Sequence, residues 1–265
     1  MLTEVRKSLK LMSYYFKFNI SAAMEYRVSF LMQAFGMALN NSAFIFFWWI
    51  LFSNVPRIGG YGFKEEMMLW AISSTSYGIC FIFFGNVNRI TKMIINGELD
   101  TYLLQPKDPL INLVCSRTIL SALGDALYGL ILFIILNGFN PVKLLLFMLF
   151  CVTGSLIIAA VLATFHALSF YAGNTEGFAQ MIIEFIISFS IYPEGIFSNA
   201  LKTLLYTALP VAFIVYIPAK VIAEFSILHL AGVVGIALLW IVIAYTLFYK
   251  GLKRYESGNL IISKL

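Results

Sequence analysis

Long apolar runs that carry no charged side chain dominate this chain of 265 residues. The first run, residues 28–55, contains no Asp, Glu, Lys or Arg, and a helix needs about 20 mostly apolar residues to cross the hydrocarbon core of a bilayer. Hydrophobic residues make up 61% of the chain and charged residues 12%. A soluble domain could not bury so much apolar surface. The sequence therefore predicts an all-α integral membrane protein and excludes a soluble enzyme.

The apolar runs predict six transmembrane helices within a single domain, residues 1–265. The first run starts too late and is too long for a cleaved signal peptide. A further run, residues 201–217, is broken by Pro210 and closed by Pro218. We therefore expect residues 193–218 to form a re-entrant helix pair on the extracytoplasmic side. The six predicted spans are residues 28–55, 67–87, 118–136, 144–171, 178–192 and 227–249.

The distribution of Lys and Arg predicts how these spans are oriented. Of the 18 basic residues, 13 lie in the segment before the first span, the loop between the second and third spans, and the tail after the sixth. The positive-inside rule then places both termini in the cytoplasm of a plasma (inner) membrane protein. The basic residues stand at the ends of apolar runs instead of forming a solvated patch, which excludes a nucleic-acid partner.

The N-terminal segment, residues 2–20, has the pattern of an amphipathic helix. Its apolar residues fall on one narrow arc, and three basic residues lie on a neighbouring arc. Such a helix lies at the membrane surface with its basic face toward anionic lipid or a partner. It is either a simple anchor or a docking helix for a cytoplasmic subunit. The apolar residues are Leu2, Val5, Leu9, Met12, Phe16 and Ile20, and the basic ones are Arg6, Lys10 and Lys17.

The sequence also predicts a short helix in the cytoplasmic loop, residues 88–112. Glu98 and Asp100 favour a helix start, where the dipole is positive. Leu99 and Leu103 are spaced i and i+4 and give this helix a small apolar face, and two prolines end it. The loop is either an ordinary amphipathic connection or a helix that inserts into a groove on a partner.

Two stretches of the sequence resemble the permease subunits of type-2 ABC exporters. One is Gly97-Glu98-Leu99-Asp100 followed by Leu103-Leu104-x-Pro106-x-x-Pro109-Leu110. The other is Tyr192-Pro193-x-x-Ile196-Phe197, followed by Pro210-Val211-Ala212-Phe213 and Pro218-Ala219. The resemblance covers nearly the whole chain, including the six predicted spans and the broken outer helix before the last one.

The resemblance implies that two such subunits, identical or different, form the translocation pathway. Two separate cytoplasmic ATPase subunits would bind beneath them and carry ATP and Mg²⁺, so this chain would hold no cofactor of its own. The N-terminal helix would be a second contact, and the re-entrant element would cap the outer end of the pathway. By matching position, the role of coupling ATPase motion to the pathway falls on Glu98, Leu99, Asp100, Tyr102, Leu103 and Leu104.

The sequence itself contains no G-x-x-x-x-G-K-[ST] phosphate-binding motif, so ATP hydrolysis is expected on another chain and this one is not an enzyme. No HExxH, GxSxG or paired Cys/His motif is present either. Three widely separated cysteines are interpreted as buried free thiols, and His166 and His229 as packed polar groups. No metal site is predicted.

Four polar side chains lie within the predicted spans: Asn40, Asn41, Asp125 and Glu184. A carboxylate inside a bilayer is costly unless it is paired or hydrated, so Asp125 and Glu184 should face a cavity or another helix. They either line the translocation pathway or make hydrogen bonds between helices or subunits. The two carboxylates also support an alternative function, a proton-coupled secondary transporter. The sequence does not identify a cargo.

Overall fold

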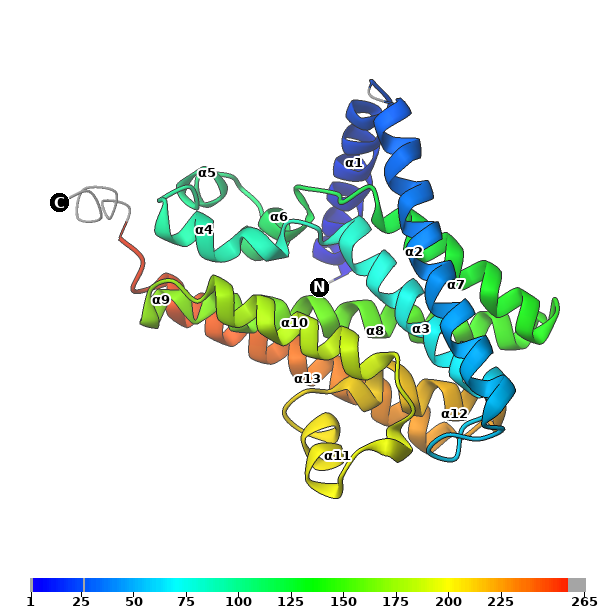
Figure 1. The fold of residues 1–265 in the computed structure, drawn as a ribbon. Coiled ribbons are helices and arrows are strands. Elements are labelled where there is room, and N and C mark those ends of the chain that lie inside the picture. The colour runs from blue at the N-terminus through cyan, green and yellow to red at the C-terminus, as the bar shows by residue number, and fades with distance from the viewer. Residues whose placement is uncertain (1, 26, 257–265) are drawn as a thin grey trace.

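The computed structural model of the protein describes residues 2–25 and 27–256, and these residues form helices and loops without a strand. Six helices run between the two ends of a bundle (Figure 1). We call the end that contains residues 84–118 the proximal end, and the end that contains residues 55–62 and 191–211 the distal end. The six helices are α2 (Arg27–Asn54), α3 (Phe63–Phe83), α7 (Ala122–Asn137), α8 (Pro141–Ala167), α10 (Glu176–Ser190) and α13 (Ile227–Leu252).

Each predicted span coincides with one of these helices, and the predicted all-helical membrane architecture is confirmed. Four are long and apolar enough to cross a membrane: α2, α3, α13, and α8 together with α9 (Ser169–Ala172). The helices α7 and α10 are shorter, with 16 and 15 residues. The helix α3 begins earlier than predicted because Gly62 is its N-cap and the acidic Glu65 and Glu66 occupy its first turn, where the helix dipole favours them.

The helix α3 lies at the centre of the bundle, and 15 of its 21 residues are buried. Small residues let its neighbours approach closely, as is usual between helices in membranes. A Cβ on Gly78 would lie 2.5 Å from the backbone nitrogen of Ala126, and a Cβ on Gly129 would lie 2.6 Å from the carbonyl oxygen of Ala71. The backbones of α3 and α7 are therefore in direct contact at two levels.

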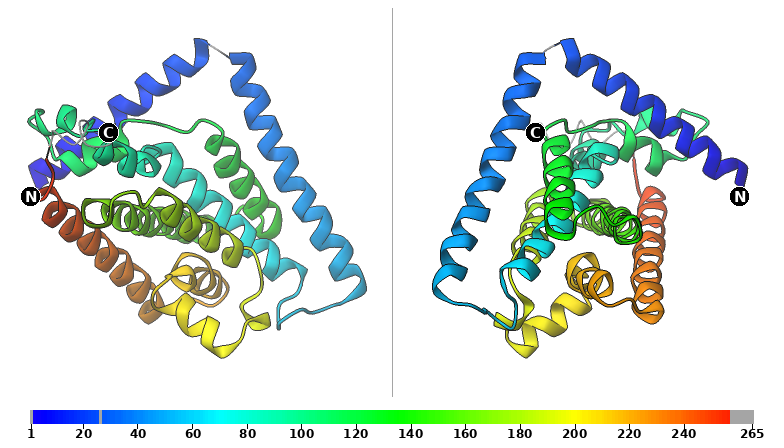
Figure 2. Two further views of the ribbon diagram at one scale, coloured as in Figure 1. Left: turned by 60° about the vertical axis from the view of Figure 1, so that its left-hand side comes forward. Right: turned by 90° about the vertical axis from the view of Figure 1, so that its right-hand side faces the viewer.

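The helix α1 (Leu2–Glu25) confirms the predicted N-terminal helix and extends it. Figure 2 shows α1 and α2 diverging from each other, with α1 crossing the proximal end of the bundle. Met12, Tyr15 and Phe16 pack against the core, whereas Lys10 and Lys17 are exposed. The side chains of residues 2–9, which carry half of the predicted apolar arc as well as Arg6, lie outside the described ones, as do the whole of Tyr26 and residues 257–265.

Residues 193–218, the predicted re-entrant element, form short helices at the distal end that are interrupted around Pro210 (Figure 1). The prediction that Pro218 closes the second helix is wrong, because the helix continues to Ala223. Proline normally breaks a helix by clashing with the carbonyl four residues earlier. Here the preceding turn is π-helical, and its wider spacing removes that clash. The elements are η2 (Glu194–Ile196), α11 (Asn199–Tyr206), η3 (Ala212–Tyr216) and α12 (Ile217–Ala223).

A polar cluster at the distal end joins η2 to α11 and α12. The carboxylate of Glu194 accepts a hydrogen bond from Tyr206 (2.7 Å) and forms an ion pair with Lys220 (2.5 Å). Burial opposes ionisation of Glu194, but the hydrogen bonds from Lys220 and Tyr206 outweigh it and hold the pKa of that carboxyl below its usual range. Beside it, the backbone of Gly195 touches that of Gly59 so closely that neither residue could carry a side chain on that side.

We expect Gly129→Ala to destabilise the protein, because the new methyl group would force α7 away from the backbone of α3. Overpacking of this kind costs about 1–3 kcal/mol, which lowers the thermal midpoint in detergent by several degrees. Gly235→Ala in α13 is the matched control, because nothing lies within 4 Å of its Cβ position. Equal midpoints for the two variants would contradict the close α3–α7 contact.

Candidate functional site

The segment that connects α3 to α7 at the proximal end, residues 84–118, is built from four short helices and is called the proximal segment here. Gly97 adopts a positive φ of 71° just after the end of α4, a conformation that glycine adopts without strain. The side chain of Asp108 caps α6 by accepting a hydrogen bond from the backbone of Ile111 (2.9 Å). The helices are η1 (Val87–Arg89), α4 (Ile90–Ile95), α5 (Asp100–Leu103) and α6 (Pro109–Cys115).

Asn86, which is 2% exposed, closes the proximal segment on itself. Its side-chain nitrogen donates to the carbonyl of Leu113 (3.0 Å) and to the hydroxyl of Ser116 (2.7 Å). Its backbone nitrogen donates to the carbonyl of Val114 (3.2 Å). These three bonds, two from the side-chain nitrogen and one from the backbone nitrogen, hold the start and the end of the segment together. The four short helices are thus joined at their base to the ends of α3 and α7.

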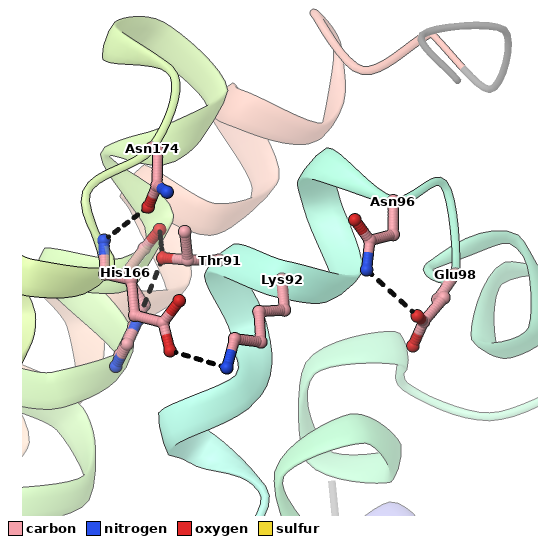
Figure 3. A network of polar contacts seen from close by, with 7 residues as sticks. Thr91, Lys92, Asn96, Glu98, His166 and Asn174 are labelled. Atoms are coloured by element: carbon pink, nitrogen blue, oxygen red, sulfur yellow. Dashed lines mark hydrogen bonds and ion pairs between the residues drawn. The ribbon is translucent and has the colours of Figure 1, made fainter. Parts of the chain in front are cut away.

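A buried hydroxyl on α4 connects the proximal segment to the end of α8 (Figure 3). The hydroxyl of Thr91 lies 2.9 Å from Nδ1 of His166 and 3.4 Å from the hydroxyls of Thr175 and Ser169. Thr91 is fully buried and His166 is 3% exposed. The interpretation of His166 as a packed polar group is confirmed. A polar cluster in such a low-dielectric setting fixes the relative position of its elements, because any separation leaves buried groups without partners.

An ion pair beside this cluster spans the same two parts of the chain. Nζ of Lys92 lies 2.9 Å from a carboxylate oxygen of Glu176 at the start of α10. The side-chain oxygen of Asn174 accepts from the backbone nitrogen of Glu176 (3.0 Å) and orders that helix start (Figure 3). Lys92 is exposed and Glu176 is partly exposed, so solvent screens the pair and it adds little stability. It does add a charge-specific contact between α4 and α10.

Two other helices reach the proximal segment through polar side chains. From α13, the hydroxyl of Tyr249 donates to the carboxylate of Asp108 (2.8 Å). From α1, the hydroxyl of Tyr15 donates to Asn112 (2.7 Å), and Asn112 donates to Gln105 (2.9 Å). The proximal segment is therefore bonded to α1, α8, α10 and α13, in addition to the helices that it connects in sequence.

The residues predicted to couple to an ATPase lie in this segment, but some of their side chains are buried in the protein and others are exposed. Leu99 is fully buried and Leu103 is half-buried against the core, so the predicted apolar face points into the protein itself. Leu104 is 87% exposed, and Glu98 is exposed with its carboxylate 3.2 Å from Asn96. The remaining two, Asp100 and Tyr102, are half-buried. The surface available to a partner is therefore the tip around Glu98 and Leu104.

The four polar residues of the predicted spans do not form one site. The side-chain nitrogen of Asn41 on α2 donates to the carboxylate of Asp125 on α7 (2.8 Å), and both residues are buried. The predicted hydrogen bond between helices is thus confirmed for Asn41. Asn40 is exposed on the same helix. Glu184 is exposed on α10, where it accepts a hydrogen bond from Gln180 (3.0 Å).

Sequence reasoning missed Glu66, the most buried carboxylate of the bundle. Its exposed fraction is 0%, and neither carboxylate oxygen has a hydrogen-bond partner among the described residues. The predicted span began at residue 67 and so left Glu66 in the preceding loop. The Gly62 cap followed by two acidic residues is the signal that could have placed it inside a helix.

The described residues contain no group of three or more His, Cys, Asp or Glu side chains that could hold a metal ion. Cys80, Cys115 and Cys151 are free and buried, as the sequence indicated.

We expect Asn41→Leu to lower stability by about 1–2 kcal/mol, because it leaves the buried Asp125 without its donor. Asn40→Leu is the matched control, since that side chain is exposed one position earlier on the same helix. Thermal midpoints in detergent measure both effects. Equal losses in the two variants would show that the Asn41–Asp125 bond has no special role.

The comparisons with known proteins agree with this arrangement. The family model described as "ABC-2 family transporter protein" matches residues 38–258, which include both the proximal segment and the broken distal helix. Comparison with curated proteins and with solved structures gives no significant match. Members of the matching family are membrane subunits that are generally not enzymes themselves. Since the match extends over far more than half of its length, this chain belongs to the ABC-2 family of transporter proteins and is a multi-pass membrane protein.

Proposed function

We propose that the chain is the membrane-spanning permease subunit of an ATP-driven exporter, moved by separate ATPase subunits that bind at the proximal end. The observation that carries this proposal is the proximal segment. Its inner side is bonded to α1, α8, α10 and α13, while its tip at Glu98 and Leu104 is exposed. A force applied to the tip would be passed to several helices at once.

The contacts suggest how that force divides. Leu99 and Leu103 seat the tip on the core, so α5 cannot move independently of the helices below it. Thr91 and Lys92 then act on α8 and α10, and Asp108 acts on α13. Interfaces of this kind switch between discrete packings and do not deform continuously. ATP and Mg²⁺ would be held by the partner, because this sequence has no phosphate-binding loop.

The proposal includes the predicted orientation in a plasma (inner) membrane. The helices α2, α3, α7, α8, α10 and α13 are the six spans, and the proximal end faces the cytoplasm together with both termini. The basic residues of the proximal end support this orientation. The helices α11 and α12 would then lie at the outer end and cap the pathway.

The exposed face of α10 supports assembly with a second permease subunit. Gln180 and Glu184 stand on this face beside Phe178, Met181 and Phe185. A carboxylate that faces lipid is unfavourable, so this strip is expected to meet the second subunit or an aqueous pathway between the two. Whether the second subunit is identical or different does not change this argument.

The alternative of a proton-coupled transporter gains no support from the arrangement of its two carboxylates. Asp125 is bonded to Asn41 inside the α2–α7 contact, and Glu184 is bonded to Gln180 on an exposed face. They do not share a partner through which a proton could pass.

We expect Leu104→Asp to reduce binding of the ATPase subunit at least tenfold, because it replaces the exposed apolar side chain of the tip with a charged one. Binding is measured as the amount of a Walker A-containing ATPase that co-purifies in mild detergent. Leu204→Asp is the matched control, since that leucine is 41% exposed at the distal end. Leu99 is unsuitable for this test, because a buried charge there would unfold the segment. Full ATPase binding by Leu104→Asp would contradict the coupling role of the tip.

We expect a cysteine at position 184 to react either with a water-soluble maleimide or, through a bifunctional maleimide, with a second permease subunit. The native cysteines are buried and give little background. Leu238→Cys on the exposed face of α13 is the control for a side chain that faces lipid. If Glu184→Cys is as unreactive as Leu238→Cys in both assays, the α10 face is not part of a pathway or subunit interface.

A further inference from the structure

An apolar groove of about 630 Å³ opens between α1, α3, α6, α8 and α13 near the proximal end. Met12 and Phe16 of α1 form one wall, and Ala159, Ala160 and Ala163 of α8 form the floor. The polar hydroxyl of Ser155 in this lining is bonded to the carbonyl of Val152 (2.8 Å). The volume lies within the range of about 300–1,000 Å³ that is typical of ligand sites.

Two basic residues of α1, Lys10 and Lys17, share a helix face with Ser13, which lines this groove. Ser13 lines the groove, and Lys10 and Lys17 lie three residues before it and four residues after it. That spacing places all three on one face of a helix. Both lysines are exposed, and Nζ of Lys10 lies 5.7 Å from the ring centre of Tyr14. The groove therefore combines an apolar interior with a positively charged, hydroxyl-bearing edge.

We propose that this groove is a binding site for an anionic phospholipid. One acyl chain lies against the alanines of α8, and the phosphate is held at the rim by Lys10, Ser13 and Lys17. A peptide in an extended conformation would bring backbone groups that the apolar lining could not satisfy. A lipid tail has no such groups, and an amphipathic helix with lysines on its polar side is suited to anionic headgroups.

The headgroup must supply the selectivity of this site. An acyl chain gains little by moving from the bilayer into an apolar groove, because both surroundings are equally apolar. A phosphate with a net negative charge does gain from two nearby ammonium groups, and a zwitterionic headgroup gains less. The bound lipid would also join α1 to α3 and α8, between which the groove lies. The site does not depend on the proposed transport function.

The test uses the purified full chain in nanodiscs that contain equal amounts of phosphatidylglycerol and phosphatidylcholine. In each sample one of the two lipids carries a photoactivatable acyl chain, and labelled peptides are identified by mass spectrometry. We expect phosphatidylglycerol to label peptides of the groove at least threefold more than phosphatidylcholine. Equal labelling by the two lipids, or labelling that avoids α8 residues 159–163, would overturn the proposal.

Variants distinguish the contribution of the lysines to headgroup preference from the contribution of the apolar groove to acyl-chain binding. Lys10→Gln combined with Lys17→Gln should remove the preference for phosphatidylglycerol while labelling by phosphatidylcholine remains. Arg57→Gln combined with Lys64→Gln, two exposed basic residues near the distal end, is the matched control and should retain the preference. Ala159→Trp should fill the groove and reduce labelling by both lipids, provided that its thermal midpoint shows a folded chain. An unchanged preference in the Lys10/Lys17 variant would contradict the assignment of the rim, whatever the behaviour of the tryptophan variant.

Discussion

The close contact between α3 and its neighbours is the constraint on which the rest of the protein depends. In an apolar solvent the hydrophobic effect does not drive helices together, so shape and hydrogen bonds must do so. Gly78 and Gly129 allow α3 and α7 to touch along their backbones, and Ser74 donates to the carbonyl of Asp125 (2.7 Å) within that contact. The Asn41–Asp125 bond then attaches α2 to the same pair. The other long helices are arranged around this centre.

The two ends of the bundle are organised differently around that centre. At the distal end, Glu194, Tyr206 and Lys220 hold the broken helix pair together, and the backbone of Gly195 packs against Gly59 in the loop between α2 and α3. At the proximal end, the connecting segment makes its bonds to helices that are distant in sequence, through Thr91, Asp108 and Asn112. This second arrangement suits a part that receives motion from outside and distributes it. At this end α1 carries the exposed Lys10 and Lys17 and borders the proposed lipid-binding groove.

Much of this organisation was predictable from the sequence, and the failures have identifiable physical causes. The apolar runs predicted the six helices between the two ends, and the acidic and apolar residues after Gly97 predicted one of the four short helices of the proximal segment, α5. Hydrophobicity could not indicate which face of each helix points inward, because lipid-facing and core-facing residues are equally apolar. In the proximal segment, the i and i+4 spacing of Leu99 and Leu103 likewise could not show whether this apolar pair faces a partner or the protein itself, and in the structure Leu99 is buried and Leu103 half-buried. The π-helical turn before Pro218 was equally invisible, since it is a local change of backbone spacing without a residue signature.

The sequence by itself determined three things: that the chain is a membrane protein, which residues form its long helices, and which family it resembles. These follow from composition, from the length of the apolar runs and from motifs. The tertiary structure alone decided which polar side chains meet. Asn40 and Asn41 are identical neighbours in the sequence, yet one is exposed and the other is bonded to Asp125. A step of one residue turns a side chain by about 100° around a helix, and only the packing of α2 against α7 selects which of the two faces inward.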